Sequence, residues 1–382
     1  MLRILHVTSL AERGGVEVIL LNILKALDRS RFDPFVLCLE NGPFVAEVAS
    51  TNTPIRVIEA GRVREMFRGA GTIAAVVRLV REERIDIVHS HNAKAHIYGG
   101  LAALLAGVPS VFHLHGVPRL TFSRDGLVNL VSVAIPAAQT IACSRYVAEA
   151  FTTAWWPHRE VMVVRNGVVP EGSGVSTNGP PVRVEFGIPP DAPLVIMVSR
   201  LQRWKGVHIF VEAVAQVARL RQDARFLVVG GSLFGLEREY ARYLRRLADQ
   251  LVVARVLQFT GHRTDVWRFY KAADIVIHSS IEPDPFPTVL LEAMAAGKPV
   301  IASEDGGPSE IVANGVTGVL VRPARPDLLA QRLLVLLADR RQRDEMGDAA
   351  VARFQSEFHA TRMVRQLQTV YEQLAGGVAR CG

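Results

Sequence analysis

Cysteine is scarce in this chain, with three residues among 382. Cys38, Cys143 and Cys381 stand far apart and show none of the spacings typical of zinc sites or disulfide frameworks. This scarcity excludes a small fold stapled by disulfides and is typical of the reducing cytoplasm. The first apolar run, MLRILHVTSL, is too short for a secretory signal, so we expect a cytoplasmic protein.

The sequence also lacks a clear membrane-spanning segment. The stretch 97–112 carries no charged residue, but it contains three glycines and Pro109. It falls short of the roughly 20 apolar residues that a membrane-spanning helix needs. Its length predicts a buried helix followed by a strand.

Lysine is rare, and the basic excess is not concentrated anywhere. Five of the 44 basic residues are lysines, and the net charge is +7. Residues 1–180 carry 18 basic and 15 acidic groups, and the remainder carries 26 and 22. Because nucleic-acid-binding proteins usually gather their basic residues in one patch or tail, nucleic acid is not an expected partner.

Short apolar runs alternate with amphipathic stretches along the whole chain. The runs expected to form strands are 4–7, 35–39, 55–58, 85–89, 111–113, 140–142, 161–164, 194–198, 226–229, 257–259, 275–277, 299–302 and 319–320. Helical spacing is found in 18–27, 71–84, 206–220, 236–250, 264–272, 289–296, 309–313 and 326–338. This alternation predicts an α/β protein with two Rossmann-like, doubly wound parallel sheets, whose ligands bind beyond the carboxyl ends of the strands.

A segment rich in glycine, proline and serine separates the two halves. It includes GVVPEGSGVSTNGPP, which has too few apolar residues to pack a core. We expect an N-terminal domain over 1–170, a linker over 171–193, a C-terminal domain over 194–355 and a final helix within 356–382. One face of that helix is apolar, so we expect it to cross back and dock on the N-terminal domain. The residues of this face are Val364, Leu367, Val370, Tyr371 and Leu374.

The most informative motif is SSIEPDPFPTVLLEAMAAGKPV, over 279–300. An apolar strand opens into an acidic, proline-rich loop, and a helix that carries Glu292 follows. Backbone amides at a helix start favour anionic or hydroxyl-rich ligands. The Glu292 carboxylate could accept two hydrogen bonds from the vicinal hydroxyls of a ribose, although a plain surface charge on the helix is the alternative.

This segment resembles the signature of glycosyltransferase family four, in which an acidic residue is followed, after seven residues, by a glutamate. The resemblance implies the GT-B fold, two Rossmann-like domains facing a central cleft. It also implies that the domain 1–170 binds the acceptor and that the domain 194–355 binds the nucleotide-sugar donor. It also implies that Glu292 binds the donor ribose and that Asp284, the first acid, acts at the donor sugar as a catalytic residue. Glu282 lies two residues earlier and is an alternative for that first position.

The amides after the first acid face the donor sugar in this family, which implies donor-binding roles for Phe286, Pro287 and Thr288. Pro287 replaces the usual glycine and has no N–H to donate. The sugar would therefore depend on Phe286 and Thr288. The identity of the donor sugar stays open for this reason.

A pair of cations follows the strand 194–198. Arg200 and Lys205 resemble the arginine and lysine that the family spaces by four residues. A fork-shaped guanidinium and a compact ammonium suit the two phosphates of a nucleoside diphosphate, whose negative charge grows as it leaves. A solvated loop is the alternative.

Three glycine-containing turns also resemble the family's donor site. Ala11–Gly15 with Val16 and Glu17 is similar to the first glycine loop, in which Gly14 and Gly15 would approach the donor diphosphate. It is no G-x-G-x-x-G fingerprint, so a dinucleotide site is not expected. Thr260–Arg263 resembles the base-binding loop and implies donor contacts by Gly261 and Arg263. Glu304–Glu310 resembles the turn below the donor.

Histidines end two strands in pairs, His89 with His91 and His113 with His115. Two such pairs could indicate a metal, but no acidic residue is spaced to join them, so no metal site and no cofactor are expected. Buried, hydrogen-bonded rings are expected for His89 and His113. His115 with Gly116 resembles the family's His-Gly at this strand end, which implies that His115 faces the reacting sugar as a catalytic residue.

The segment 62–84 holds six arginines against three glutamates. Two interpretations are open, a contact with an anionic membrane that presents a lipid-linked acceptor, or a solvated helix face. Acceptor specificity is expected in the loops 60–70 and 116–126.

The resemblance covers essentially the whole chain. It implies a retaining glycosyltransferase that moves a hexose from a nucleoside-diphosphate sugar, with UDP favoured and GDP as the alternative. The acceptor is the hydroxyl of a glycan, a lipid-linked sugar or a small molecule. No pair of carboxylates is placed as a hydrolase requires. A phosphorylase or epimerase and a non-catalytic nucleotide-sugar sensor are the rival hypotheses.

Overall fold

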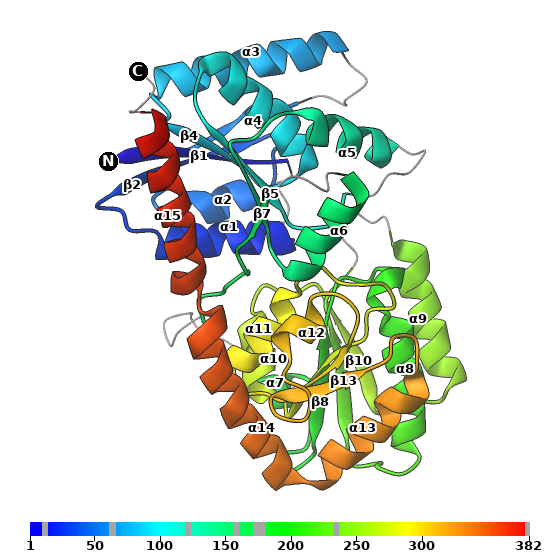
Figure 1. Cartoon of the computed structure of the whole chain (residues 1–382). Helices are drawn as coiled ribbons and strands as arrows, with labels where there is room; N and C mark the ends of the chain where they lie inside the picture. The colour runs from blue at the N-terminus through cyan, green and yellow to red at the C-terminus, as the bar shows by residue number, and fades with distance from the viewer. Residues whose placement is uncertain are drawn as a thin grey trace. The chain divides into compact units, whose positions relative to one another are not determined.

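The contacts of the chain divide it into two units, each built on its own parallel sheet (Figure 1). The first comprises Met1–Val169 with His359–Gly382, and the second comprises Pro170–Phe358. This computed structural model describes residues 1–9, 14–60, 66–118, 124–155, 160–170, 181–231 and 237–378. Residues 11–13 of the first glycine loop, residues 61–65 and 119–123 of the two predicted specificity loops, and the linker segment 171–180 lie outside these ranges. So do Arg62, Arg64, Glu65 and Cys381.

The sheet of the first unit has seven strands in the order β3-β2-β1-β4-β5-β6-β7. They are β1 Leu2–Thr8, β2 Phe32–Cys38, β3 Ile55–Val57, β4 Ile87–Ser90, β5 Ser110–Leu114, β6 Gln139–Ala142 and β7 Val161–Val163. All neighbours pair in parallel. The order reverses between β1 and β4, and such a reversal opens a crevice beyond the carboxyl ends of the two strands.

Helices connect the strands of the first unit. They are α1 Gly15–Ala26, α2 Phe44–Ala49, α3 Met66–Glu82, α4 Ala93–Ala106, α5 Arg124–Ala134, α6 Arg145–Trp155 and α15 Ala360–Val378. The predicted helix and strand within 97–112 are present as α4 and β5. Asn92 caps the start of α4 by accepting a hydrogen bond from the Ala95 amide, and Gly107 ends it in the left-handed conformation.

The last helix, α15, belongs to the first unit although it follows the second in the chain. Figure 1 shows it, at the red end of the colour bar, beside α1. Its predicted apolar face packs into one core with residues of β1, α1, β2 and β4. The members of this core from α15 are Met363, Val364, Leu367, Val370 and Tyr371, with Leu374 partly buried.

The sheet of the second unit has six parallel strands in the order β10-β9-β8-β11-β12-β13. They are β8 Leu194–Val198, β9 Arg225–Val229, β10 Leu257–Gly261, β11 Ile275–His278, β12 Val300–Ser303 and β13 Gly318–Val321. The residues of β11 and β12 are buried throughout, as expected for parallel strands covered on both faces. Here the order reverses between β8 and β11.

Within the described residues, ten helical segments accompany this second sheet. They are α7 Val182–Glu185, the 3₁₀ turn η1 Arg203–Lys205, α8 Val207–Ala218, α9 Arg238–Gln250, α10 Val266–Ala272, α11 Thr288–Ala295, α12 Pro308–Ile311, α13 Pro326–Ala338, α14 Arg340–Arg353 and the π-helical segment η2 Phe354–Phe358. The prediction of an α/β protein with two Rossmann-like parallel sheets is confirmed. Among the described residues no helix combines the length and apolar content that crossing a bilayer requires.

Candidate functional site

In the second unit, the loops that follow β8 and β11 meet at the point where the strand order reverses. Gly206 lies against the Ser279 carbonyl so closely that an added Cβ would stand 1.9 Å from that oxygen, and its φ of +69° also favours glycine. The Ser279 hydroxyl donates to the Gly206 carbonyl at 2.9 Å, and the Ile281 amide donates to the Trp204 carbonyl at 2.8 Å. These contacts hold the loop with the predicted cations against the acidic loop.

The meeting of these loops brings Lys205 and Asp284 together. The Lys205 Nζ donates to the Asp284 Oδ2 at 2.5 Å, and the His278 Nε2 lies 3.1 Å from the same oxygen. Both side chains of the ion pair are largely buried, and the Lys205 ammonium also stands 4.0 Å above the Trp204 ring. Two residues predicted from separate motifs therefore form one charged centre.

The charge state of Asp284 follows from its neighbours. Burial by itself raises the pKa of the carboxyl, because a low-dielectric surrounding penalises the charged form. The Lys205 ammonium and the hydrogen bond from His278 outweigh that penalty and hold the pKa well below its ordinary value. Asp284 is thus an anion over the whole physiological range.

The structure places the two acids of the motif differently. Asp284 is buried beside Lys205, whereas Glu282 is exposed. The Asp284 backbone is also fixed, because the Gly307 amide donates to its carbonyl at 2.8 Å. Of the two acids, Asp284 is therefore the one at the charged centre.

Glu292 lies within α11 and is half-buried. The hydroxyl of Tyr270, from α10, donates to its Oε2 at 2.8 Å. Burial, followed by the Glu292 charge, raises the pKa of Tyr270 well above its ordinary value, so the phenol keeps its proton. This hydrogen bond orients the carboxylate.

The residues between these acids begin helix α11. Pro287 is its N-cap with an extended backbone, and Thr288 is its first residue. The Phe286 ring is buried against Phe358, with ring centroids 6.0 Å apart, so its side chain serves the core. Only the backbone of Phe286 is left for the predicted donor contact.

The other residues of this unit that were predicted to bind the donor are Arg200, Arg263 and Gly261, and they differ in exposure and in their contacts. Arg200 is exposed. The Arg263 guanidinium is held by Asp265 at 2.7 Å and by Glu185 at 2.9 Å, which occupies the side chain that the sequence assigned to the donor. Gly261 ends β10 with φ +73°, and its carbonyl accepts from the Gly230 amide at 3.0 Å.

In the first unit, Gly14 is the N-cap of α1 and Gly15 its first residue. The Gly14 amide donates to the Glu17 Oε2 at 3.1 Å, while the Thr8 hydroxyl donates to the Glu17 Oε1 at 3.2 Å. A capping box of this kind satisfies the amide without a ligand. The donor contact of Gly14 and Gly15 therefore stays a prediction.

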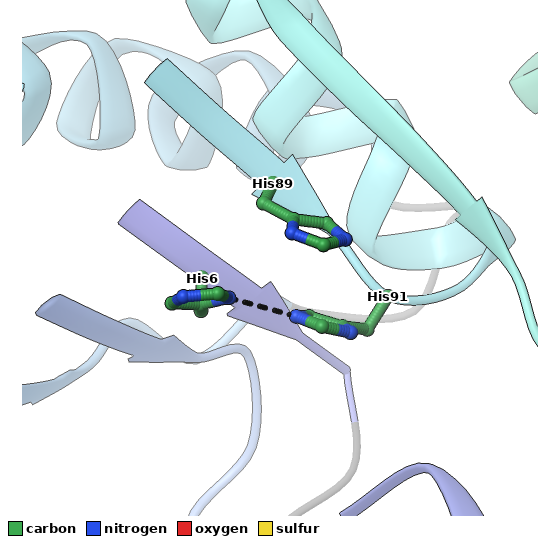
Figure 2. Close-up of side chains that lie close together, drawn as sticks. All are labelled: His6, His89 and His91. Atoms are coloured by element: carbon green, nitrogen blue, oxygen red, sulfur yellow. Dashed lines mark hydrogen bonds between the residues drawn. The ribbon is translucent and has the colours of Figure 1, made fainter. Parts of the chain in front are cut away.

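The carboxyl ends of β1, β4 and β5 carry a cluster of five histidines, which we call the histidine cluster: His6, His89, His91, His113 and His115. Figure 2 shows three of its members, with the His6 Nδ1 and the His91 Nε2 joined at 3.0 Å. The hydrogen-bonded row continues from the His91 Nδ1 to the His115 Nε2 at 3.3 Å. The strands thus place one row of three rings at the reversal between β1 and β4.

A second row lies next to the first. The His89 Nε2 is 3.2 Å from the His113 Nδ1, and the His89 Nδ1 is 2.6 Å from the hydroxyl of Tyr371 in α15. The prediction that His89 and His113 are buried and hydrogen-bonded is confirmed. His115, the predicted catalytic histidine, is half-buried at the outer end of the first row.

Burial keeps the histidine cluster uncharged. It lowers the pKa of His6 and of His115 to about 3, with a smaller contribution from Arg29 at His6. Burial, followed by the neighbouring rings, also places the pKa values of His89, His91 and His113 well below the ordinary value. The rings are neutral at physiological pH, and each carries one N–H and one lone pair.

Several participants in these sites were not singled out by their sequence, among them His6, Tyr270, His278 and the hydroxyl of Tyr371. His6 and His278 do leave a signal, because each directly follows a buried apolar run of its strand, residues 4–5 and 275–277. The tyrosines leave none, since their partners are distant in the chain.

Comparison with known proteins gives consistent matches across both units. The family model described as "Glycosyltransferase Family 4" matches residues 13–171, and "Glycosyl transferases group 1" matches residues 180–353. A D-inositol 3-phosphate glycosyltransferase of Corynebacterium urealyticum is 28% identical, over 95% of this chain and 93% of that protein. An N-acetyl-alpha-D-glucosaminyl L-malate synthase of Bacillus anthracis is 27% identical, over 78% of this chain and 77% of that protein.

A solved structure shows the same architecture. HepE of Anabaena, crystallised with UDP and glucose, superposes with a TM-score of 0.85 at 27% identity, over 97% of this chain and all of HepE. The same protein has also been solved with UDP-glucose. The chain therefore belongs to glycosyltransferase family four, and it is a glycosyltransferase with the GT-B fold.

Proposed function

We propose that the chain transfers a hexose from a nucleoside-diphosphate sugar, with UDP as the favoured nucleotide and GDP as the alternative. The observation that carries this proposal is the position of Lys205, whose ammonium is held by Asp284 where the order of the second sheet reverses. Ligands of parallel α/β sheets bind at such reversals. The UDP and UDP-glucose in the HepE crystals support the choice of nucleotide.

Each predicted residue then has a chemical task. Lys205 and Arg200 stabilise the negative charge that develops on the leaving diphosphate. Glu292, oriented by Tyr270, accepts hydrogen bonds from the two ribose hydroxyls. Asp284 and His115 face the donor sugar, and the backbone amides of Phe286 and Thr288 contribute donors beside them. Gly14 and Gly15 approach the diphosphate, and the backbone around Gly261 faces the base.

The transfer itself proceeds with retention at the anomeric carbon. The bond between that carbon and the diphosphate oxygen breaks as the acceptor oxygen bonds to the same face of the sugar, and the acceptor proton passes to the leaving phosphate. Neither a metal nor an organic cofactor is needed for this step. Positioning of the two substrates and stabilisation of charge supply the rate.

The acceptor that we propose is the hydroxyl of a glycan or a lipid-linked sugar, reached in the cytoplasm at the inner face of the membrane. Arg78, Arg81 and Arg84 are exposed at and after the end of α3, where they could contact anionic lipid.

Sedimentation with vesicles tests this contact. Binding to anionic but not zwitterionic vesicles should weaken in Arg78→Glu and persist in the control Arg245→Glu, which changes an exposed residue of α9. Equal behaviour of the two variants would remove the membrane proposal and leave sugar transfer untouched.

A panel of UDP-, GDP- and ADP-sugars tests the transfer proposal. We expect binding by calorimetry and slow release of free sugar for a UDP-sugar, both continuing in the presence of a chelator. Glu292→Gln should weaken donor binding about tenfold or more, because it removes a charged acceptor. The control Glu239→Gln changes an exposed residue of α9 and should have no effect. The proposal fails if no donor is bound or turned over and Glu292→Gln behaves like the control.

Nuclear magnetic resonance of the released sugar tests retention separately. With an α-linked donor, the α anomer should be released first. Release of the β anomer would contradict retention without contradicting transfer.

A further inference from the structure

The histidine cluster offers more nitrogen atoms than its hydrogen bonds use. Among the described residues, the buried His113 Nε2, His115 Nδ1 and His6 Nε2 have no hydrogen-bond partner. A buried nitrogen left unpaired costs about 1–3 kcal/mol. Apolar rings would fill the same space without this cost. Of the three nitrogens, the unpaired His113 Nε2 is a candidate ligand atom.

Three of the rings come close enough to share one ion. One ring nitrogen each of His91, His113 and His115 lies within 4.8 Å of the others. The His91 Nδ1 and the His115 Nε2 are 3.3 Å apart. Two nitrogens bound tetrahedrally to zinc, at about 2.0–2.1 Å each, stand about 3.4 Å apart. These two nitrogens therefore already have the separation that ligation requires.

The neighbouring side chains can direct the lone pairs towards that ion. Histidines that bind a metal donate their other N–H to a fixed acceptor. The His6 Nδ1, joined to the His91 Nε2 in Figure 2, supplies such an acceptor and leaves the His91 Nδ1 with a lone pair. His89 does the same for His113: it accepts from the Nδ1 of that ring and passes its own N–H to the Tyr371 hydroxyl. The lone pair of His113 is then on the unpaired Nε2.

The outer end of the cluster gives an ion access. His115 is half-buried, so an ion can enter beside it and keep a water molecule as a fourth ligand. The rings of His113 and His115 are 4.0 Å apart and tilted by 32°, so one of them must turn for both lone pairs to meet one ion.

The alternative set of His6, His89 and His91 is fully buried and shares His91 with the first. Because a neutral imidazole has one lone pair, only one of the two sets can be filled at a time.

We propose that His91, His113 and His115 bind one divalent transition-metal ion of the kind that prefers imidazole, such as Zn²⁺ or Co²⁺. Neutral nitrogen ligands select these ions over Mg²⁺ and Ca²⁺, which prefer oxygen. The sequence led us to expect no metal, because no acidic residue is spaced to join the two histidine pairs. The set proposed here needs none, since it uses three imidazoles. Ligation would take His115 away from the donor sugar, so the loaded form should transfer more slowly. That last consequence depends on the proposed function, whereas the binding itself does not.

Cobalt titration of the untagged, chelator-treated full chain at neutral pH tests the binding directly. We expect visible d–d absorption of a nitrogen-ligated Co²⁺, one ion per chain by elemental analysis, and loss of the absorption when Zn²⁺ is added. His91→Gln, His113→Gln and His115→Gln should each abolish the signal. His6→Gln, which removes only an outer acceptor, should weaken affinity about 10–100-fold.

The matched control is His96→Gln. His96 is also a buried histidine of the first unit, but its ring packs on Phe112 and belongs to neither set. Circular dichroism and thermal unfolding without metal identify variants that fail to fold. If His91→Gln does not fold, His115→Gln still tests the proposal, because His115 is only half-buried and its replacement disturbs the core less. Absence of Co²⁺ binding, or equal loss in His96→Gln, overturns the proposal. Binding kept in His113→Gln and His115→Gln but abolished in His6→Gln overturns the assignment of these three ligands.

Discussion

Both units place polar residues where the order of a parallel sheet reverses, but they do so by opposite means. In the first unit the residues are neutral rings that stand on or directly after the strands β1, β4 and β5. In the second they are an ammonium and a carboxylate on loops, held together by close backbone approaches at glycine. A strand positions a side chain through the register of the sheet, whereas a loop needs specific contacts to do so.

This difference decides how each site meets a ligand. The charged pair in the second unit is largely shielded from water, which strengthens its electrostatic interaction with a charged ligand. The neutral rings of the first unit offer hydrogen bonds and lone pairs without repelling or attracting a charged substrate. Three experiments follow that could break or sharpen this comparison.

The largest effect is expected from mild acid. An unfolded histidine takes up a proton near pH 6.5, but His6 and His115 stay neutral in the folded chain down to about pH 3. Between these values the unfolded chain binds more protons, so stability falls as the pH falls, by about 1.4 kcal/mol per pH unit for each ring. At about pH 5 this amounts to about 2 kcal/mol per buried ring. The stability that Asp284 contributes is lost only below about pH 4, where the unfolded carboxyl gains its proton.

Calorimetric scans at about pH 7.5 and about pH 5, with limited proteolysis to assign the transitions, measure this effect. The first unit should lose much of its stability and the second should lose little. His6→Gln removes one titrating ring and should make the dependence on pH shallower. If the second unit loses as much stability as the first between these two pH values, the assigned charge states are wrong.

The next effect is expected from removing the ammonium of the second unit. Lys205→Met leaves the Asp284 carboxylate, 6% exposed, without its cation. Breaking a buried ion pair in this way costs about 3–5 kcal/mol of unfolding free energy, because a buried charge is left uncompensated. Lys271→Met, at an exposed position of the same unit, should stay within about 0.5 kcal/mol of the parent protein. Urea denaturation compares the two, and equal small losses would show that the pair is not buried as described.

The smallest effect is the difference in unfolding free energy between two glycine substitutions, one at the contact between the loops and one away from it. Gly206 and Gly187 have similar positive φ angles, +69° and +61°, but only at Gly206 would a Cβ strike a backbone oxygen. Gly187→Ala should cost about 1–2 kcal/mol for its left-handed backbone alone. Gly206→Ala should cost at least about 2 kcal/mol more, because the two loops must separate. Equal losses would mean that the loops are not held by this approach.

Much of the fold was predictable because the strands are continuous apolar runs. The expected strands 194–198 and 140–142 correspond to β8 and β6, and the helix and strand expected within 97–112 correspond to α4 and β5. The helix α14 was not predicted. Its sequence, RRQRDEMGDAAVAR, is mostly charged or small and has no regular apolar stripe.

The candidate site was predictable in its parts but not in its assembly. The motifs named Lys205, Asp284 and Glu292, yet nothing in the sequence indicates that Lys205 pairs with a carboxylate 79 positions away. Such pairings depend on strand order, here the adjacency of β8 and β11, which a single sequence does not reveal. The histidine cluster was missed for the same reason, since β1 supplies His6 and β4 its partner.

A ribosome making this chain releases the strands of the first unit long before it releases α15. Until that helix emerges, the apolar surface of Ile4, Ile19 and Phe32 has no cover, and His89 lacks the hydroxyl of Tyr371. Uncovered apolar surface on a nascent chain is a target for chaperones and a risk for aggregation. The half of the protein that is synthesised first is therefore the half that becomes native last.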